Sequence, residues 1–450
     1  MKRRWFAASL LILALAGAVA YFVTRPEPND TRHNGAYAVD GGEPFFVTAR
    51  GGSELRIRWM DGRSHRLLPA DGDRYRIGAA FSQTEPTIGE VAFETTSDGG
   101  RVLVLTEEGA PPVRARRLEL PEEAMTVRSA GLELRGRLVL PDDDEGEAPF
   151  PAVVLVHGSE DRSAVETYVE PYVFASHGIA TLVFDKRGTG ESDGDYTQNF
   201  DLLADDVVAA VRRLREHPRI DTAAIHLAGF SQGGWIAPLA AARDGGIRSV
   251  LVGYGPAVPV TAEDRWGYVY QLRQEGFGED AIAAADSVNA MIEAVMDRGE
   301  DRWEELGDRL DAARDEPWFD AVRGSDSMLG FLADSWMPMW MIELYGRWRM
   351  RGDVPFIDRT YDPVPTLDGL DVPSLWLLGG EDYSSPTGWT LEALDSLRER
   401  GRPIQTRVFD AADHGILLFE EDDAGRRRYT RYAPDYFPTM VEWLRGRRDG

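Results

Sequence analysis

The chain has 450 residues, 43% of them hydrophobic, which is enough for two or three folded units with substantial cores. It contains no cysteine, which excludes a disulfide framework, a thiolate nucleophile and a cysteine-based metal site. Its formal net charge of −26 disfavours nucleic acid as a partner, because an acidic surface repels a phosphate backbone.

The N-terminal residues 1–25 have the pattern of a signal peptide or a single N-terminal anchor. A basic start is followed by an apolar run over residues 6–23, in which Ala18-Val19-Ala20 offers a cleavage site. The run is at the short end for crossing a bilayer, so both cleavage and retention as a membrane tether stay open. We therefore expect an exported protein of the periplasm or cell envelope.

A linker and a small β domain follow. Residues 26–35 are rich in Pro, Asn and Asp and show no periodicity, which indicates a linker. Residues 36–120 contain short strands separated by Asp-Gly turns and no long amphipathic helix, which predicts a small antiparallel barrel or sandwich. The strands are expected at residues 44–49, 54–60, 64–68, 74–77, 90–95 and 101–105.

From residue 121 apolar strands alternate with amphipathic helices, one of them expected over residues 166–176. This alternation predicts a mostly parallel sheet with helices on both faces. The first part of the α/β core covers residues 121–260 and the second part residues 363–450. Residues 261–362 between them are mostly helical and rich in large aromatic side chains. We interpret this insertion as a lid over the active face of the core.

The motif Gly229-Phe230-Ser231-Gln232-Gly233 lies between a predicted strand and a predicted helix. In that setting Gly-x-Ser-x-Gly is a nucleophile elbow, whose glycines permit a tight turn and whose helix N-terminus stabilises developing negative charge. Ser231 is therefore the predicted nucleophile. The segment Gly190-Glu191-Ser192-Asp193-Gly194 has the same spacing but lies in a polar loop, so we interpret Ser192 as a chance match.

Histidine is the usual base for a serine nucleophile at neutral pH. Of the seven histidines, six are predicted in the linker, the β domain, helix ends, a buried strand or a turn after the first core strand. His414 remains, in a loop after the last strand, and the base comes last in chain order when an elbow supplies the serine. Asp382, just past the strand that ends at Gly379, is predicted to orient His414, with Glu381 as the alternative.

An oxyanion hole needs two backbone N–H donors. One is predicted to be the amide of Gln232, directly after the nucleophile. The other is the amide of Ser159 in His157-Gly158-Ser159, which follows the strand expected over residues 151–156. An ordinary turn at this strand end is the alternative.

Together these pieces resemble the α/β-hydrolase superfamily. The matching segments are His157-Gly158-Ser159, Asp185-Lys186-Arg187-Gly188-Thr189-Gly190-Glu191-Ser192, Gly229 to Gly234, Gly379 to Asp382 and His414-Gly415. Within the superfamily the chain is similar to bacterial exported esterases and to serine peptidases of the prolyl-oligopeptidase type. The resemblance implies a structural loop role for Asp185 and Arg187. The lid and the β domain lie outside it.

These observations leave three functions open. The first is a carboxylesterase that forms an acyl-enzyme on Ser231, with the aromatic lid favouring an apolar or aromatic substrate group. The second is an exported serine peptidase or aminopeptidase in which Glu263, Asp264 and Asp334 of the lid bind a peptide amine, although these acids also fit solvated helix faces. The third is a non-catalytic binding protein of the cell envelope, against which the complete set of three catalytic groups argues. The sequence has no metal-binding or phosphate-binding motif, so we expect no cofactor and a small ester or short peptide as substrate.

Overall fold

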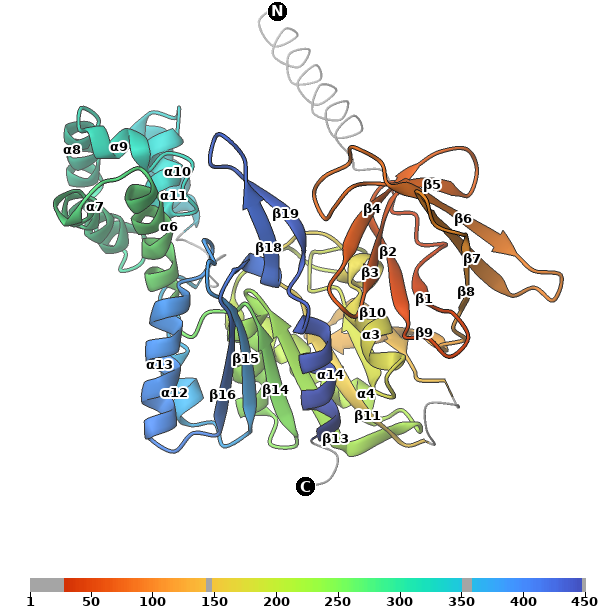
Figure 1. Ribbon diagram of the computed structural model, residues 1–450. Coiled ribbons are helices and arrows are strands. Elements are labelled where there is room, and N and C mark those ends of the chain that lie inside the picture. The colour runs from red at the N-terminus through yellow and green to blue at the C-terminus, as the bar shows by residue number, and fades with distance from the viewer. Residues whose placement is uncertain (1–27, 143–147, 350–357, 447–450) are drawn as a thin grey trace, which may run out of the picture.

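The computed structural model describes residues 28–142, 148–349 and 358–446. The signal or anchor segment predicted over residues 1–25 lies outside the described residues. Among the residues that are described, no helix is both long enough and apolar enough to cross a membrane. These residues form a β barrel, an α/β core and a helical insertion (Figure 1).

The N-terminal unit is a closed barrel of antiparallel strands, in sequence order around the barrel. The strands are β1 Gly35–Ala38, β2 Phe45–Gly51, β3 Glu54–Trp59, β4 Ser64–Pro69, β5 Arg74–Ile77, β6 Gly89–Thr95, β7 Arg101–Glu107 and β8 Val113–Arg117. The sequence missed the short β1 and the arginine-rich β8, whose pairing closes the barrel. The expected linker ends early, because His33 stacks on Phe93 and Asn34 is buried against the barrel.

The α/β core is an eight-stranded sheet in the order β16-β15-β14-β13-β11-β12-β10-β9. Strands β11 to β16 pair in parallel, and β9 and β10 form an antiparallel edge. The bounds are β9 Glu122–Ser129, β10 Leu132–Val139, β11 Phe150–Val156, β12 Ala180–Phe184, β13 Ile220–Phe230, β14 Ser249–Gly253, β15 Ser374–Gly379 and β16 Ile404–Phe409. The predicted mostly parallel sheet is confirmed.

Helices cover both faces of this sheet. One face packs against α4 Phe200–Arg215, α5 Gly233–Arg243, α12 Val364–Asp368 and α13 Thr387–Glu399. The other face packs against α2 Ala164–Thr167, α3 Glu170–Ala175 and α14 Tyr436–Gly446. The prediction of a single helix over residues 166–176 was wrong, because this segment forms two short helices. Tyr168 is extended and ends α2, and Pro171 lies in the first turn of α3, because proline lacks the N–H that a helix interior requires.

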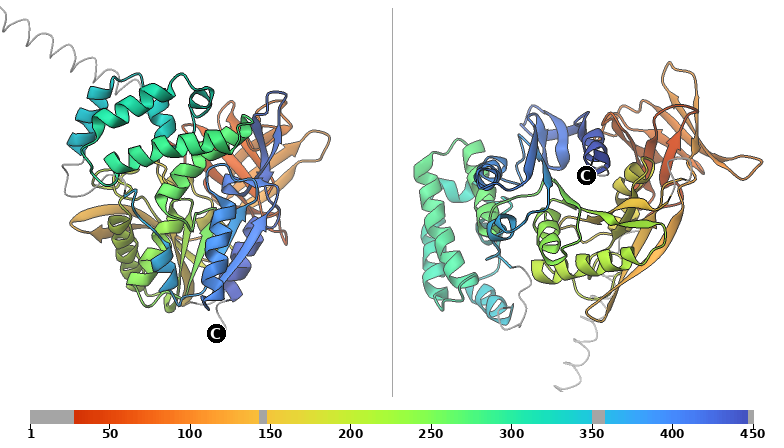
Figure 2. Two further views of the ribbon diagram at one scale, coloured as in Figure 1. Left: turned by 90° about the vertical axis from the view of Figure 1, so that its left-hand side faces the viewer. Right: turned by 90° about the horizontal axis from the view of Figure 1, so that it is seen from below.

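The insertion between β14 and α12 is helical and has a core of its own (Figure 2). Its helices are α6 Val260–Gln274, α7 Glu279–Met296, α8 Trp303–Ala313, α9 Pro317–Ala321, α10 Met328–Asp334 and α11 Met339–Arg349. Several of its aromatics, such as Tyr268, Trp303 and Trp318, are buried in that core. They therefore hold the lid together, whereas Phe331 lines a cavity beside Ser231.

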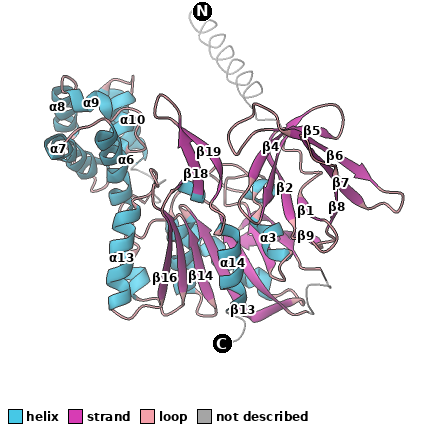
Figure 3. Ribbon diagram, viewed as in Figure 1, coloured by secondary structure: helices cyan, strands magenta, loops and turns pink. Residues whose placement is uncertain are grey.

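A three-stranded antiparallel unit after β16 was not predicted. It consists of β17 Ala412–Asp413, β18 Leu417–Glu421 and β19 Arg427–Tyr432, and its β18–β19 hairpin rises above the core between the helical insertion and the barrel (Figure 3). The backbone amides of Phe81 and Ser82 in the barrel donate hydrogen bonds to carbonyls of β19, at 2.9 and 3.0 Å. The barrel is thereby joined to the segment that carries His414.

Candidate active site

Ser231 lies at a sharp turn between β13 and α5. Its φ of 52° is in the left-handed region, which a non-glycine residue adopts only where its surroundings enforce it. A Cβ added to Gly229 would lie 2.1 Å from the carbonyl oxygen of Gly233, and one added to Gly233 would lie 2.3 Å from that of Val156. Glycine at both positions lets β13, α5 and β11 approach closely, and the turn presents Ser231 at the carboxyl edge of the sheet.

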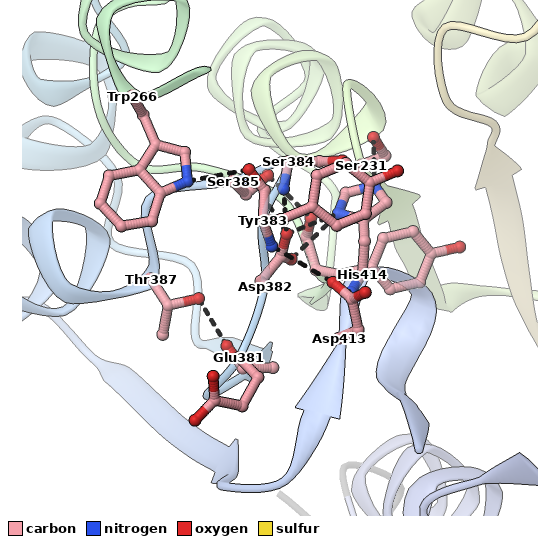
Figure 4. Close-up of polar contacts among 12 residues, drawn as sticks. Ser231, Trp266, Glu381, Asp382, Tyr383, Ser384, Ser385, Thr387, Asp413 and His414 are labelled. Carbon is pink, nitrogen blue, oxygen red and sulfur yellow. Dashed lines mark hydrogen bonds and ion pairs between the residues drawn. The ribbon is translucent and has the colours of Figure 1, made fainter. Parts of the chain in front are cut away.

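Ser231, His414 and Asp382 form a continuous hydrogen-bonded chain (Figure 4). His414 Nε2 lies 3.0 Å from Ser231 Oγ, and His414 Nδ1 lies 2.9 Å from Asp382 Oδ2. The three residues come from three separate loops, after β13, β15 and β17. An aspartate that accepts from Nδ1 leaves Nε2 free to accept the serine proton, so this chain has the geometry of a nucleophile, a base and an orienting acid.

The Asp382 carboxylate is held in place by its own loop. The side chain is buried, and its Oδ1 accepts hydrogen bonds of 2.8 Å from the backbone amides of Ser384 and Ser385. The alternative acid, Glu381, has a largely exposed side chain, 4.0 Å from Arg427. The structure therefore brings Asp382, and not Glu381, to the histidine.

Asp413, next to the histidine, has a different task. It is fully buried and accepts hydrogen bonds from the backbone amide of His414, from the Tyr429 hydroxyl and from Arg427. These contacts attach the His414 loop to β19. Asp413 is therefore a residue that structures the His414 loop.

Both predicted oxyanion donors lie beside Ser231. The amides of Ser159 and Gln232 donate no hydrogen bond within the described part of the chain, which leaves them open to a ligand oxygen. Gly158 packs directly on the serine, because a Cβ added to it would lie 3.3 Å from the Ser231 Cβ. Two free N–H groups on either side of a nucleophile are the elements of an oxyanion hole.

Lys186 links the two halves of this hole, and sequence reasoning gave it no role. It is the one lysine in the described chain, it is 2% exposed, and its Nζ donates to the carbonyl of Gly158 at 2.5 Å and to Gln232 Oε1 at 2.8 Å. The Gly158 carbonyl belongs to the same planar peptide unit as the Ser159 amide, so the ammonium that holds the oxygen also fixes the direction of the N–H. The signal in the sequence was a lysine two residues after an apolar strand, in a chain whose other lysine is Lys2.

The titration of these groups reflects burial and neighbouring charge. Burial alone would lower the pKa of His414, but the charge and hydrogen bond of Asp382, with Glu263 and Asp413, raise it above its ordinary value. Burial lowers the pKa of Lys186 to about 8, partly offset by Glu160. A histidine whose charged form is stabilised is a stronger base for the serine proton.

Two cavities meet at Ser231 and His414, one on each side. The cavity on the lid side measures about 720 Å³, and its described lining includes four carboxylates, Glu263, Asp264, Asp326 and Asp334, one arginine, Arg359, and His414. Arg359 is bound to Asp264 at 3.0 Å. The pKa of Glu263 is raised to about 8, chiefly by burial. The charge of His414 opposes this rise and the charge of Asp326 adds to it. The cavity on the barrel side measures about 480 Å³ and is lined by residues of the core and of the barrel.

The second Gly-x-Ser-x-Gly match is structural. Ser192 Oγ donates to the carbonyl of Asp185 at 2.7 Å and accepts from the amide of Arg135 at 2.8 Å. Asp185 in turn accepts from Ser163 at 2.8 Å, and Arg187 is bound to buried Asp206 at 2.6 Å. Among the described residues there is also no cluster of three or more side chains suited to a metal ion.

The sheet and the elbow define the α/β-hydrolase fold, and Ser231, His414 and Asp382 have the arrangement that serine hydrolases of this fold use. Residues 147–277 match the family model described as serine aminopeptidase, S33. The chain is 42% identical over 126 residues to a thiohydrolase, AneE, of Aspergillus aculeatus, covering 27% of this chain and 37% of that protein. It is 32% identical over 149 residues to esterase EstD of Thermotoga maritima, covering 31% and 35%.

Similarity to solved structures spans more of the chain at lower identity. An acylaminoacyl peptidase of Pyrococcus horikoshii covers 92% of this chain and 56% of that one, at 16% identity and a TM-score of 0.44. The matched segments of the two curated relatives span about a third of their lengths, 37% and 35%. The substrate is therefore not carried over from any of them.

Proposed function

We propose that the chain hydrolyses carboxylic esters through an acyl-enzyme on Ser231. The observation that carries the proposal is the hydrogen-bonded chain from Ser231 Oγ through His414 to Asp382, beside two unengaged backbone amides. A binding protein has no need of this combination. The esterase and the thiohydrolase among the relatives support acyl transfer to water as the reaction.

The steps follow from the geometry. His414 Nε2 takes the proton of Ser231 as Oγ attacks the ester carbonyl, and the carbonyl oxygen becomes an oxyanion bound by the Ser159 and Gln232 amides. His414 then gives that proton to the leaving alcohol as its bond to carbon breaks. A water molecule attacks the acyl-enzyme, loses its proton to His414 and releases the acid. The proton finally returns to Ser231.

The test is hydrolysis of 4-nitrophenyl esters from acetate to octanoate by the wild type and by Ser231→Ala. Ser192→Ala is the matched control, because that serine has the same motif and only structural contacts. We expect turnover that is lost in Ser231→Ala and kept in Ser192→Ala. Turnover that survives in Ser231→Ala beyond the uncatalysed rate contradicts the proposal.

An aminopeptidase is the second candidate, and the lid-side cavity favours it. Glu263 and Asp326 line this cavity and form no ion pair within the described part of the chain. A bound substrate ammonium would pair with Asp326 and would favour the ionised form of Glu263, whose pKa burial raises to about 8 in the free protein. Asp264 and Asp334, which the sequence grouped with Glu263, are engaged with Arg359 and with the amide of Gly324.

Amino-acyl 4-nitroanilides with a free or an acetylated amine test this candidate. Glu263→Gln is expected to reduce kcat/KM for the free amine about tenfold or more, because it removes one partner of a charge-assisted contact. Glu304→Gln, a lid acid away from the cavity beside Ser231, is the control. Equal rates for free and acetylated substrates in wild type and Glu263→Gln exclude amine recognition.

We further propose that the chain is exported, on the strength of the basic and apolar pattern of residues 1–25. Fractionation of cells that express the full chain tests this proposal. Recovery of the whole protein in the cytosol contradicts it.

A further inference from the structure

The barrel forms one wall of the second cavity beside Ser231. Ala49, Arg50 and Arg58 of β2 and β3 line this cavity together with Gly158, Ser159, Ser231 and His414 of the core. The barrel therefore lies within reach of the substrate. The hydrogen bonds between the barrel and β19 hold this wall against the His414 segment.

This wall is positively charged in an acidic protein. Three arginines line the cavity, Arg50, Arg58 and Arg162, against two glutamates, Glu160 and Glu170. The whole chain carries a formal charge of −26, and the cavity on the lid side has four carboxylates and one arginine. The positive charge of this wall is therefore local and opposite in sign to the net charge of the whole chain.

Two of these arginines have no carboxylate partner in the described part of the chain. Arg58 is 8% exposed and donates to Thr48 Oγ1 at 2.8 Å and to the Tyr432 hydroxyl at 3.4 Å, yet it forms no ion pair within the described residues. Arg162 is exposed, with no hydrogen bond or ion pair in the described chain. A buried guanidinium without an ion pair is costly, and an anion that enters the cavity would offset that cost.

Arg50 adds to this excess. It pairs with Glu54 at 2.9 Å, but Glu54 also accepts two hydrogen bonds of 2.7 Å from Arg66, so one carboxylate serves two guanidinium groups. Arg50, Arg58 and Arg162 therefore converge on one cavity with less negative charge than they can bind.

Resting on Ser231 as the nucleophile, we propose that this barrel-side cavity binds a carboxylate of the substrate. Arg58 is the buried charge of this subsite, and Arg50 and Arg162 lie at its mouth. A planar guanidinium matches a carboxylate through two parallel N–H donors, which makes carboxylate the fitting ligand. The carboxylate belongs to either the acyl part or the leaving group, and the enzyme selects esters that carry it near the scissile carbonyl.

Two pairs of substrates distinguish these positions. The 4-nitrophenyl half-ester of adipate carries the carboxylate on the acyl part, and its adipamate counterpart is neutral. 4-Acetoxybenzoate carries the carboxylate on the leaving group, and 4-acetoxybenzamide is neutral. In one of the two pairs we expect the wild type to prefer the anion. Arg58→Gln and Arg162→Gln are each expected to reduce that anionic-to-neutral ratio of kcat/KM about tenfold.

Arg114→Gln is the matched control, because Arg114 is a barrel arginine in an exposed ion pair with Glu94 and does not line the cavity. It is expected to keep the wild-type ratio. If Arg58→Gln does not fold, Arg162→Gln decides the test. Ratios that are the same in wild type and Arg162→Gln for both pairs overturn the subsite, while turnover of the neutral esters keeps the proposed function.

Binding to the inactive Ser231→Ala variant separates the two proposals. Isothermal titration with adipate reports the subsite without any turnover. We expect binding that weakens about tenfold when Arg162→Gln is added. Absence of adipate binding to Ser231→Ala refutes the subsite, whether or not any ester is hydrolysed.

Discussion

Replacing Lys186 with methionine removes the one cation that joins both oxyanion donors and keeps most of the side-chain volume. The deletion of a whole oxyanion donor costs about 10²–10³ in kcat. In Lys186→Met both amides remain and lose only the contact that fixes their direction, through the Gly158 carbonyl and the Gln232 side chain. We therefore expect kcat for a 4-nitrophenyl ester to fall about 10–100-fold, with KM changed less than about threefold, because the loss is confined to the transition state.

The stability of the same variant should change little. Replacing a buried charge by an apolar group of similar size is often neutral or stabilising by about 1–4 kcal/mol. The Gly158 carbonyl and the side-chain oxygen Oε1 of Gln232 lose a donor, which costs about 1–3 kcal/mol. Since these effects oppose each other, we expect the free energy of unfolding in urea to shift by less than about 2 kcal/mol.

The pH profile separates an electrostatic role from a packing role. Lys186, with its pKa lowered by burial to about 8, is charged below that pH and loses its proton above it, so wild-type kcat should fall as pH rises past 8. Glu263 titrates in the same range, with its pKa raised by burial to about 8. The alkaline fall should disappear in Lys186→Met and persist in Glu263→Gln. An unchanged kcat in Lys186→Met, or a loss of kcat matched by a loss of stability, refutes this role.

Four further outcomes are expected. The kcat/KM of the wild type should rise with pH through a midpoint above 6.5, because His414 must be neutral to act as the base and Asp382 raises its pKa. A midpoint below 6.5 would contradict this effect of Asp382. Asp382→Asn should lower kcat about 10³–10⁴-fold at constant fold, measured beside its circular dichroism spectrum. Gly229→Ala should lose about 3 kcal/mol of stability in a urea melt, since its Cβ would lie 2.1 Å from a carbonyl oxygen. Arg187→Met should cost about 3–5 kcal/mol, because Asp206 would stay buried without its partner.

Local pattern was enough to predict the core and the serine. The Gly-x-Ser-x-Gly motif and the alternation of apolar strands with helices depend on near neighbours in sequence, whereas Asp382 and His414 were predicted from their order along the chain. Lys186 could not be assigned from pattern, because its role depends on Gly158 and Gln232, which approach it only when β11, β12 and β13 pair.

Contacts between the units were also beyond the sequence. In the sequence, nothing distinguishes Arg58 from the other residues of a predicted strand. The closed barrel and the unpredicted β18–β19 hairpin bring it to the cavity beside Ser231. The lid aromatics have mixed positions. Their composition suggested an apolar or aromatic substrate group, whereas Tyr268, Trp303, Trp318 and Phe319 are buried in the lid core, Trp336 and Trp340 are exposed, and four acids line the cavity beside Ser231.

The most direct test of the central claim is to react the purified full chain with a fluorophosphonate and map the adduct by peptide mass spectrometry. We expect a single phosphonylated residue, Ser231, with labelling that slows strongly in His414→Ala. An adduct on Ser192 or on another serine, or no adduct on the folded protein, would contradict Ser231 as the nucleophile.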